Sequence, residues 1–472
     1  MRPRSPHIAS LALGIYAAVT AILAVAAALF ASNSGLDPIA RFAWIAAASI
    51  VALGSLLAIA GVWSATGAYA AVFGCFHFGL VVLLAVGYIA PADLSLWDES
   101  WVLSPFAAEA AGLALAGSLA FASGACLIYS RRVRVWMSDR QQNGREAGHP
   151  HSVAGSVLVF AAIAIWCGIV VSTGGVTGFF GSYEEYLQMT SDFGAALAII
   201  WLVLGCGAVL SVTGRPSWHR TAALITFGCF SLVALPLGLR SEVMFPAVAM
   251  LIALARCGRA ITPLKAGAVG LLLLLVVPIV RDLRATGLRA LFEAELTPPG
   301  LDALAEMGGS LHPVEKVVRW HSEGEAFEWG ASYWAPFERA AAKLLPGLAD
   351  PAAEDDLRLM NVLVLDRIGA IGFSPVAEAF RNFGPLGVVI VLGLLGMVMG
   401  AIDTIGNPRT AVLAIATLFV PLLINVRNSF VSVPAQCVAG ILIVTAVVGT
   451  RHVVGSVLAK PYARVADIRS EI

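Results

Sequence analysis

Twelve runs of mainly apolar residues divide the chain, and each is close to the length that crosses a lipid bilayer. A helix needs about 20 such residues to cross the hydrocarbon core. Of the 472 residues, 59% are hydrophobic and 13% are charged, whereas a soluble domain is about 45–50% apolar and about 25% charged. The sequence therefore predicts an all-α polytopic membrane protein and excludes a soluble or disordered chain. The expected spans are residues 9–31, 43–63, 68–90, 106–129, 153–172, 193–213, 220–237, 243–255, 266–280, 385–402, 410–426 and 430–450.

One long hydrophilic segment between the spans sets the domain organisation. We expect nine helices in residues 1–280, a large loop at 281–382, three helices in 383–450 and a tail at 451–472. The loop is too long to be a simple connection. Lys and Arg gather in the termini and in the short loops on the same side, which places both termini in the cytoplasm and the long loop outside. Within the loop we expect short helices at Arg284–Leu296, Pro313–Trp320, Trp334–Lys343 and Ala353–Arg367.

Arginines lie at the outer ends of three expected spans. Arg240 occupies the very short connection between the seventh and eighth spans, Arg281 and Arg284 follow the ninth, and Arg427 lies between the last two. Charges at membrane depth are costly and are usually paired or functional, and a planar guanidinium binds phosphate oxygens with two parallel hydrogen bonds. We therefore predict a phosphate or pyrophosphate clamp. The alternatives are a local Arg240–Glu242 pair, snorkelling, and anchoring at the membrane interface.

The end of the long loop carries the strongest local signals. Ser374 followed by proline predicts a helix start, and Gly384 followed by proline predicts a break before the tenth span. Glu378 and Asn382 are one helical turn apart, so they share a face. We predict that Glu378 is a general base for a hydroxyl group. The alternatives are a helix cap or a surface pair with Arg381.

Two histidines of the loop are further acid–base candidates. His312, in a Leu-His-Pro sequence, is the stronger and His321 the weaker, and a structural hydrogen-bond donor is the alternative for both. The sequence has no phosphate-binding glycine loop, dinucleotide fingerprint or nucleophile elbow, and no His or Cys group with zinc spacing. We therefore expect a metal-independent reaction without a cofactor. The balanced formal charge gives no reason to expect nucleic acid as a partner.

Four stretches between about residues 170 and 430 resemble the O-antigen polymerases of the Wzy type, also called oligosaccharide repeat-unit polymerases. Their order and spacing carry the likeness more than any one motif. They are Gly174-Gly175-Val176 with Phe179-Phe180; Gly238-Leu239-Arg240-Ser241; Leu311-His312-Pro313 with Gly330-Ala331-Ser332-Tyr333 and Leu345-Pro346; and Gly372-Phe373-Ser374-Pro375 through Glu378 to Asn382-Phe383-Gly384, with Arg427. Residues 182–186 depart from the expected pattern, because they contain no basic residue.

The resemblance implies a glycosyltransferase of the bacterial inner membrane, with a GT-C-like architecture and a periplasmic active site. It would transfer the growing glycan from a polyprenyl pyrophosphate to a sugar hydroxyl of the next lipid-linked repeat unit, making O-antigen or another surface polysaccharide. The implied partners are lipid-linked oligosaccharide as donor and acceptor, the bilayer, and flippase and chain-length regulator proteins. The implied catalytic residues are Glu378 and His312, and the implied substrate-binding residues are Arg240, Arg281, Arg284, Arg427, Asn382 and Tyr333.

Three other functions compete with polymerisation. An O-antigen ligase would use the same donor with lipid A-core as acceptor. A lipid-linked oligosaccharide flippase would need a charged path through the bundle, whereas the ionisable residues gather at one face and no repeated halves are visible. A scaffold for an export complex would tolerate the loss of Arg240 and Arg427.

Overall fold

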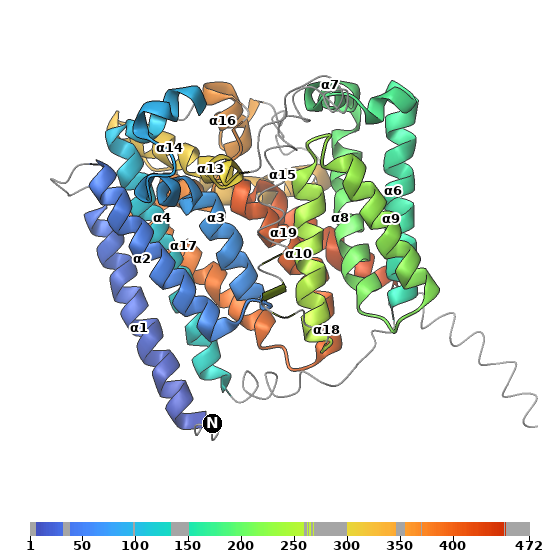
Figure 1. The fold of residues 1–472 in the computed structure, drawn as a ribbon, viewed down its shortest axis with the longest axis horizontal. Helices are drawn as coiled ribbons and strands as arrows, with labels where there is room; N and C mark the ends of the chain where they lie inside the picture. Colours follow the sequence, from blue (N-terminus) through green and yellow to red (C-terminus); the bar gives the residue numbers. More distant parts are fainter. Residues whose placement is uncertain are drawn as a thin grey trace, which may run out of the picture.

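The structure is a computed structural model, and it describes residues 6–31, 38–97, 100–133, 151–258, 262, 264–265, 268, 300–345, 355–369, 371–447 and 449. Every regular element in these ranges is a helix, and the long helices run side by side, with several short ones over one end (Figure 1). We call this end, which carries α7, α13, α14 and α16, the loop end of the bundle. The described residues confirm the prediction of an all-α fold.

Nine helical segments of the described chain are long and apolar enough to cross a membrane. They are α1 (Pro6–Phe30), α2 (Pro38–Ala60), α3 (Ala65–Ala85), α4 (Pro105–Arg131), α6 (Ser152–Gly174), η4 (Ser191–Phe193) continued by α8 (Gly194–Val212), α17 (Pro375–Asp403), and the segments Pro408–Arg427 and Phe430–Val447. The segment Pro408–Arg427 consists of α18 (Pro408–Ala414), the π-helical turn η7 (Ile415–Phe419), α19 (Val420–Ile424) and η8 (Asn425–Arg427).

Three of the expected spans differ from these nine segments. The seventh and eighth correspond to α9 (Trp218–Ala234) and α10 (Arg240–Arg256), with 17 residues each, and α10 is longer than the expected run of residues 243–255. The expected ninth span lies outside the described residues, so twelve spans remain a prediction. The tenth span follows a kink at Gly384 in α17, and the helix on the near side of the kink begins at Pro375, as the Ser-Pro sequence predicted.

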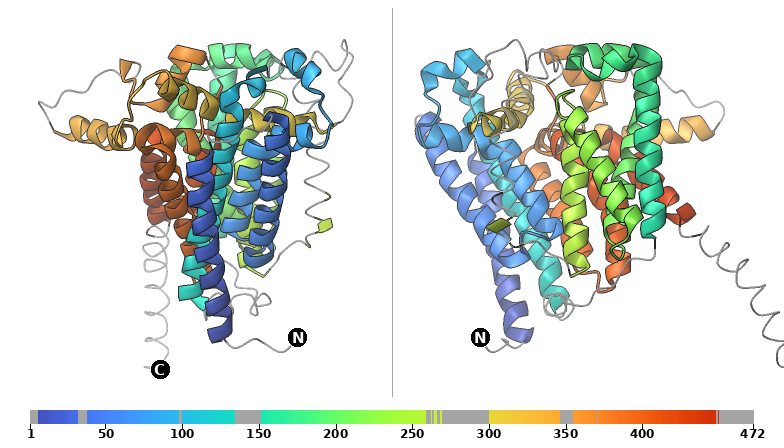
Figure 2. Two further views of the ribbon diagram at one scale, coloured as in Figure 1. Left: turned by 90° about the vertical axis from the view of Figure 1, so that its left-hand side faces the viewer. Right: turned by 45° about the vertical axis from the view of Figure 1, so that its right-hand side comes forward.

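The long loop forms short helices as expected, with different bounds. They are α13 (Asp302–Gly308), η5 (Gly309–Leu311), α14 (His312–Ser322), α15 (Ala331–Leu344) and α16 (Met360–Ile368). The predicted helix at Arg284–Leu296 lies outside the described residues. The connections before α4 and α8 hold η1 (Pro91–Trp97), η2 (Ser100–Leu103), η3 (Val176–Phe179) and α7 (Tyr183–Met189). Figure 2 shows these segments over the same end of the bundle as α13 and α14.

Small residues bring α4 and α17 into direct backbone contact. A Cβ atom at Gly124 would lie 2.0 Å from the carbonyl oxygen of Gly393, and one at Gly396 would lie 2.0 Å from that of Phe121. Apolar side chains gain little by leaving lipid for a protein interior, so close packing at small residues is what holds membrane helices together. This contact fixes α17, and with it the start of that helix, against the bundle.

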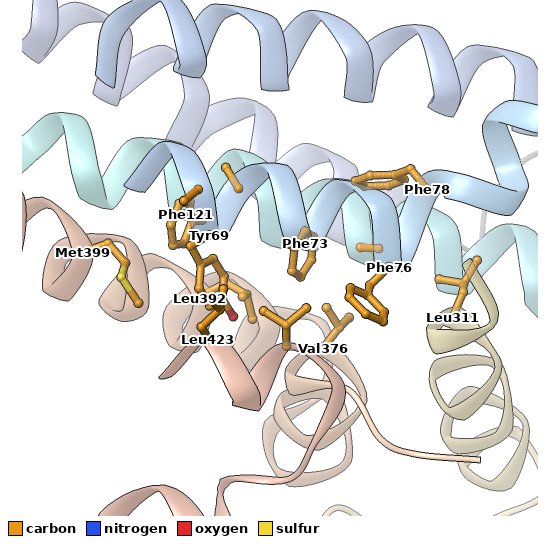
Figure 3. Close-up of a cluster of buried hydrophobic side chains, with 14 of the residues drawn as sticks. Tyr69, Phe73, Phe76, Phe78, Phe121, Leu311, Val376, Leu392, Met399 and Leu423 are labelled. Carbon is orange, nitrogen blue, oxygen red and sulfur yellow. The ribbon is translucent and has the colours of Figure 1, made fainter. Parts of the chain in front are cut away.

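Aromatic residues of α3 line the core beside α17. Tyr69, Phe73 and His77 follow each other at intervals of four residues, and the Phe73 and His77 rings stack with centroids 4.0 Å apart. Figure 3 shows Tyr69, Phe73 and Phe76 facing Leu392 and Val376 of α17. A second apolar core, centred on Trp166, joins α6, α7, α8, α9 and α10. The two cores meet at α8 and α10, which contribute residues to both.

A buried carboxylate joins three helices at the opposite end. Asp403 ends α17 and accepts hydrogen bonds from the backbone N–H groups of Ala65 (2.7 Å) and Thr66 (3.0 Å), at the start of α3. The Tyr129 hydroxyl of α4 donates to it at 2.7 Å. Arg256, at the end of α10, donates to the Asp403 carbonyl oxygen at 3.2 Å. An anion at a helix N-terminus is stabilised by the helix dipole and by the free N–H groups.

Candidate functional site

The start of α17 is built by the residues that predicted it. The Ser374 hydroxyl accepts a hydrogen bond from Val376 N–H at 3.1 Å, so Ser374 is the N-cap, with proline in the first turn. The same hydroxyl lies 2.7 Å from Nε2 of His77, and both residues are buried. Gly384 has φ +69°, which divides α17 into a short first segment and a long span. The predicted cap and break are both confirmed.

Glu378 lies within this first segment with an exposed fraction of 0%. Its Oε1 accepts a hydrogen bond from the Ser332 hydroxyl at 2.8 Å, and its Oε2 accepts one from Phe430 N–H at 2.7 Å. A carboxylate has about four lone-pair positions, so lone pairs remain for a further donor. The alternative of a surface pair is wrong, because Glu378 is buried and Arg381 pairs with Glu328 instead. The contact with Phe430 N–H, at the start of η9 (Phe430–Ser432), is of the kind that the alternative of a cap requires.

Two polar groups beside Glu378 are buried without a hydrogen-bond partner. The Asn382 side chain donates to the Ser332 hydroxyl and to the Glu378 carbonyl oxygen, both at 2.8 Å, while its Oδ1 has none. The Tyr333 hydroxyl is also buried and unpartnered, and its ring stacks on Phe383 with centroids 6.1 Å apart. Burial, and then the nearby charge of Glu378, raises the pKa of the Tyr333 hydroxyl well above its usual range. Tyr333 therefore remains a hydrogen-bond donor.

Arg240 begins α10 and is held by a residue of the long loop. Its Nη1 lies 2.7 Å from Oε1 of Glu306, on α13. The predicted alternative of an Arg240–Glu242 pair is therefore wrong, and Glu242 accepts from the Ser241 hydroxyl instead. The Nε and Nη2 atoms of Arg240 are buried and make no hydrogen bond. Buried donors without an acceptor are costly, so these two nitrogens are suited to bind an anionic ligand.

Arg427 ends η8, in the turn before the last span. Its guanidinium lies over the Phe76 ring, 5.8 Å from the centroid, and its carbonyl oxygen accepts from Phe373 N–H at 2.9 Å. It also interacts electrostatically with Glu242, two residues beyond Arg240. The turn that carries Arg427 is therefore joined to the start of α17 and lies close to the start of α10.

Arg240 and Arg427 are both placed by contacts with the second half of α3. Arg427 lies over the Phe76 ring. Arg240 pairs with Glu306 of α13, and α13 packs so closely on α3 that a Cβ at Gly79 would lie 2.2 Å from the Leu304 carbonyl oxygen. Arg240 and Arg427 thus lie at the same end of the bundle, near neighbouring turns of α3. Arg281 and Arg284 lie outside the described residues, so their share in a clamp stays a prediction.

His312 and His321 make ring contacts at two other places in the loop, and the His312 Nε2 atom is buried without a hydrogen-bond partner. The His312 ring stacks on Trp101 with centroids 4.8 Å apart and planes 6° apart. The His321 ring stacks on Phe327, and its Nδ1 lies 2.8 Å from the Glu325 carbonyl oxygen. The hydrogen bonds of the Glu378 side chain come from Ser332 and Phe430. The choice of acid–base group among Glu378, His312 and His321 stays a prediction.

Several residues of the site had no assigned role in the sequence. Ser332 stood in a recognised motif, but only the fold shows its hydroxyl between Glu378 and Asn382. His77 could have been chosen as a candidate site residue, because it is an ionisable residue inside an apolar span. Glu306 could not have been chosen, because one acidic residue of the loop resembles the others. In the described part of the chain, no group of three or more His, Cys, Asp or Glu side chains is placed to hold a metal ion.

The fold and this arrangement define a multi-pass membrane protein whose buried carboxylate and guanidinium groups lie at one end of the bundle. Residues 152–454 match the family model of the O-antigen polysaccharide polymerase Wzy. This match covers more than half of the chain, and the chain belongs to that family. The predicted resemblance is confirmed, and every site residue predicted from the sequence falls within the match. Family membership and the membrane-length helices make this a multi-pass protein of the bacterial inner membrane.

One curated relative gives a consistent but partial likeness. Protein CapE of Staphylococcus aureus is 28% identical over 164 residues, which is 34% of this chain and 36% of CapE. The match therefore spans about a third of that relative's length. No solved structure matches the chain significantly, so the expected GT-C-like architecture stays a prediction.

Proposed function

We propose that the chain polymerises lipid-linked oligosaccharide repeat units into O-antigen or capsule at the periplasmic face. The loop end would face the periplasm, with both termini in the cytoplasm. The donor would be a glycan on polyprenyl pyrophosphate and the acceptor a sugar hydroxyl of the incoming repeat unit. The observation that carries the proposal is the Arg240 guanidinium, whose buried Nε and Nη2 lack a partner at the end that holds Glu378.

The proposed reaction assigns one role to each charged group. The acceptor hydroxyl attacks the anomeric carbon, the bond from that carbon to the pyrophosphate oxygen breaks, and the hydroxyl proton moves to Glu378. Arg240 and Arg427 hold the pyrophosphate and stabilise the negative charge that develops on it as it leaves. Asn382 Oδ1 and the Tyr333 hydroxyl, both unpartnered, are suited to hydrogen-bond the sugar. We expect no metal ion to take part in this step.

Burial of the carboxylate supports its proposed role. Glu378 is screened from solvent by α15, by the turn before the last span and by α17 itself. Excluding water protects an activated glycosyl donor from hydrolysis. The Ser332 and Phe430 hydrogen bonds fix the direction of the carboxylate, which is a condition for general base catalysis.

The test uses the full chain, purified and reconstituted in lipid nanodiscs. Lipid-linked repeat units are added with or without lipid A-core, and products are separated by size. Polymerisation predicts a ladder from repeat units alone, with free polyprenyl pyrophosphate released once per transfer. A single addition that requires lipid A-core would replace the proposal with a ligase function. Movement of lipid-linked oligosaccharide across the bilayer without chain growth would replace it with a flippase function.

A further inference from the structure

Helix α15 projects sideways from the bundle at the level where the long helices end (Figure 2). Its outer part presents large apolar side chains to the surroundings. Trp334 is 61% exposed and Phe337 46% exposed, and their rings lie side by side with centroids 5.7 Å apart. Leu345, directly after the helix, is 56% exposed. Large apolar side chains gathered in this way mark a surface that is covered in the working protein.

The apolar residues of this outer part form one stripe along the helix. Trp334, Phe337 and the half-buried Ala341 recur at intervals of three and four, so they share a face. Glu338, one turn after Trp334, borders the stripe and pairs with Arg358 at 2.6 Å. Arg339 and Lys343 lie on the other side of the helix, where Arg339 is 3.9 Å from Asp356. A short helix with tryptophan on one side and basic groups on the other is typical of a helix lying in a membrane interface.

The stripe continues the surface by which α17 faces lipid. Leu386, Ile390 and Leu394 of α17 are exposed at intervals of four residues along a span. Phe383, just above Leu386 and also exposed, stacks on Tyr333 at the start of α15. The Phe383–Tyr333 stack therefore connects the exposed apolar side chains of α17 to those of α15. This continuity identifies lipid as the covering partner.

The first turn of α15 belongs to the site. Ser332 donates to Glu378 and accepts from Asn382, and Tyr333 packs against Phe383 and Phe430. The outer part of the same helix carries Trp334 and Phe337. A shift of the outer part would therefore move Ser332 relative to Glu378.

We propose that α15 lies in the headgroup layer of the bilayer at the loop end, with Trp334 and Phe337 inserted at the boundary of the acyl chains. Interfacial helices reach about 5–10 Å into this boundary. The lipid surface then holds Ser332 and Tyr333 in place beside Glu378. The position of α15 in the headgroup layer is independent of what the protein does. The claim that lipid holds Ser332 and Tyr333 in place rests on the proposed function.

Membrane contact is tested by fluorescence of the full chain in vesicles of phosphatidylcholine. The signal of Trp334 is the difference between the unsubstituted protein and Trp334→Phe. We expect this difference to be quenched by lipid brominated near the glycerol end of its chains, and less by lipid brominated near the methyl end. Aqueous acrylamide should quench it weakly. A difference signal that acrylamide quenches fully and brominated lipid leaves unchanged would overturn the proposal.

Coupling to the site is tested by transfer activity. Phe337→Glu should lower transfer by about tenfold to a hundredfold, since small displacements of catalytic groups cost that much. Phe337→Leu, which keeps an apolar side chain, should retain activity and shows that the position tolerates substitution. The matched control is Leu187→Glu, an exposed apolar residue of α7 outside the site, which should also retain activity.

The two parts of the proposal fail in different ways. Normal transfer by a folded Phe337→Glu protein would remove the coupling and leave the membrane contact standing. Inactivity of the unsubstituted chain on lipid-linked repeat units would instead remove the proposed function, and the fluorescence result would still decide the position of α15.

Discussion

The Ser332 hydroxyl lies 2.8 Å from Oε1 of Glu378, although the two residues are separated by 46 positions in the chain. This hydrogen bond joins a helix of the long loop to the first segment of a membrane span. The Asn382 amide donates to the same hydroxyl, so Ser332 links two residues of α17. The loop therefore forms part of the wall around the carboxylate.

Replacing Glu378 with glutamine should remove the proton acceptor while preserving most of the local hydrogen bonds. The glutamine oxygen can accept from Phe430 N–H, and its amide can donate to the Ser332 hydroxyl. We expect single-turnover transfer to fall by about 10²–10⁴, the usual contribution of a general base, with donor binding near normal. Ser332→Ala, which leaves the carboxylate in place, should be milder. Unchanged transfer in Glu378→Gln would assign the role of base to another group.

His312→Gln should retain transfer close to that of the unsubstituted protein. The imidazole stacks on Trp101 and makes no hydrogen bond to Glu378, so its loss removes packing rather than a proton acceptor. The same single-turnover assay measures this. A drop as large as that of Glu378→Gln would make His312 the base instead.

Arg240→Ala should abolish polymer formation in a protein that still folds and inserts. Arg240→Lys should recover only part of the activity, because an ammonium group cannot make two parallel hydrogen bonds to a phosphate. Glu306→Gln is the matched control, since it removes the charge that pairs with Arg240 but leaves the guanidinium. We expect this variant to retain most activity. Equal losses in Arg240→Ala and Glu306→Gln would show that Arg240 acts only through its ion pair.

Gly384→Ala should destabilise the first segment of α17. The backbone there has φ +69° and ψ −161°, a conformation essentially restricted to glycine that costs other residues about 1–3 kcal/mol. An added Cβ would also lie 2.8 Å from Phe327. Gly393→Ala on the same helix is the control, because its nearest neighbour would be 3.7 Å away. We expect a lower thermal midpoint and reduced transfer for Gly384→Ala alone.

Asp403→Ala should lower stability without affecting the site. It leaves the Ala65 and Thr66 N–H groups without their acceptor and removes one of the two acceptors of the Tyr129 hydroxyl, which keeps Thr66 Oγ1. Each unsatisfied buried group costs about 1–3 kcal/mol. Thermal unfolding in detergent measures the loss. Transfer per folded molecule should stay normal, because Asp403 lies at the opposite end of α17 from Glu378. Reduced transfer at full stability would contradict this separation.

Local features of the fold were predictable from the sequence, and long-range partners were not. Ser374 and Gly384 act through their own backbone, so the start and the break of α17 follow from a few consecutive residues. The bond between Arg240 and Glu306 joins positions 66 residues apart, and nothing local distinguishes Glu306. The start of α10 was placed too late, because its first turn carries polar and charged residues that hydropathy alone assigns to a connection.

The Asp403 cluster has a mechanical consequence. One carboxylate holds the start of α3, a hydroxyl of α4 and the end of α17, while Arg256 secures α10 to the adjacent carbonyl group. These helices are thereby pinned together at one end and cannot separate there without breaking charge-assisted bonds in the interior. Any widening of the bundle has to pivot about this point and open at the far end. In the proposed function, the glycan would therefore enter and leave at the loop end, away from this cluster.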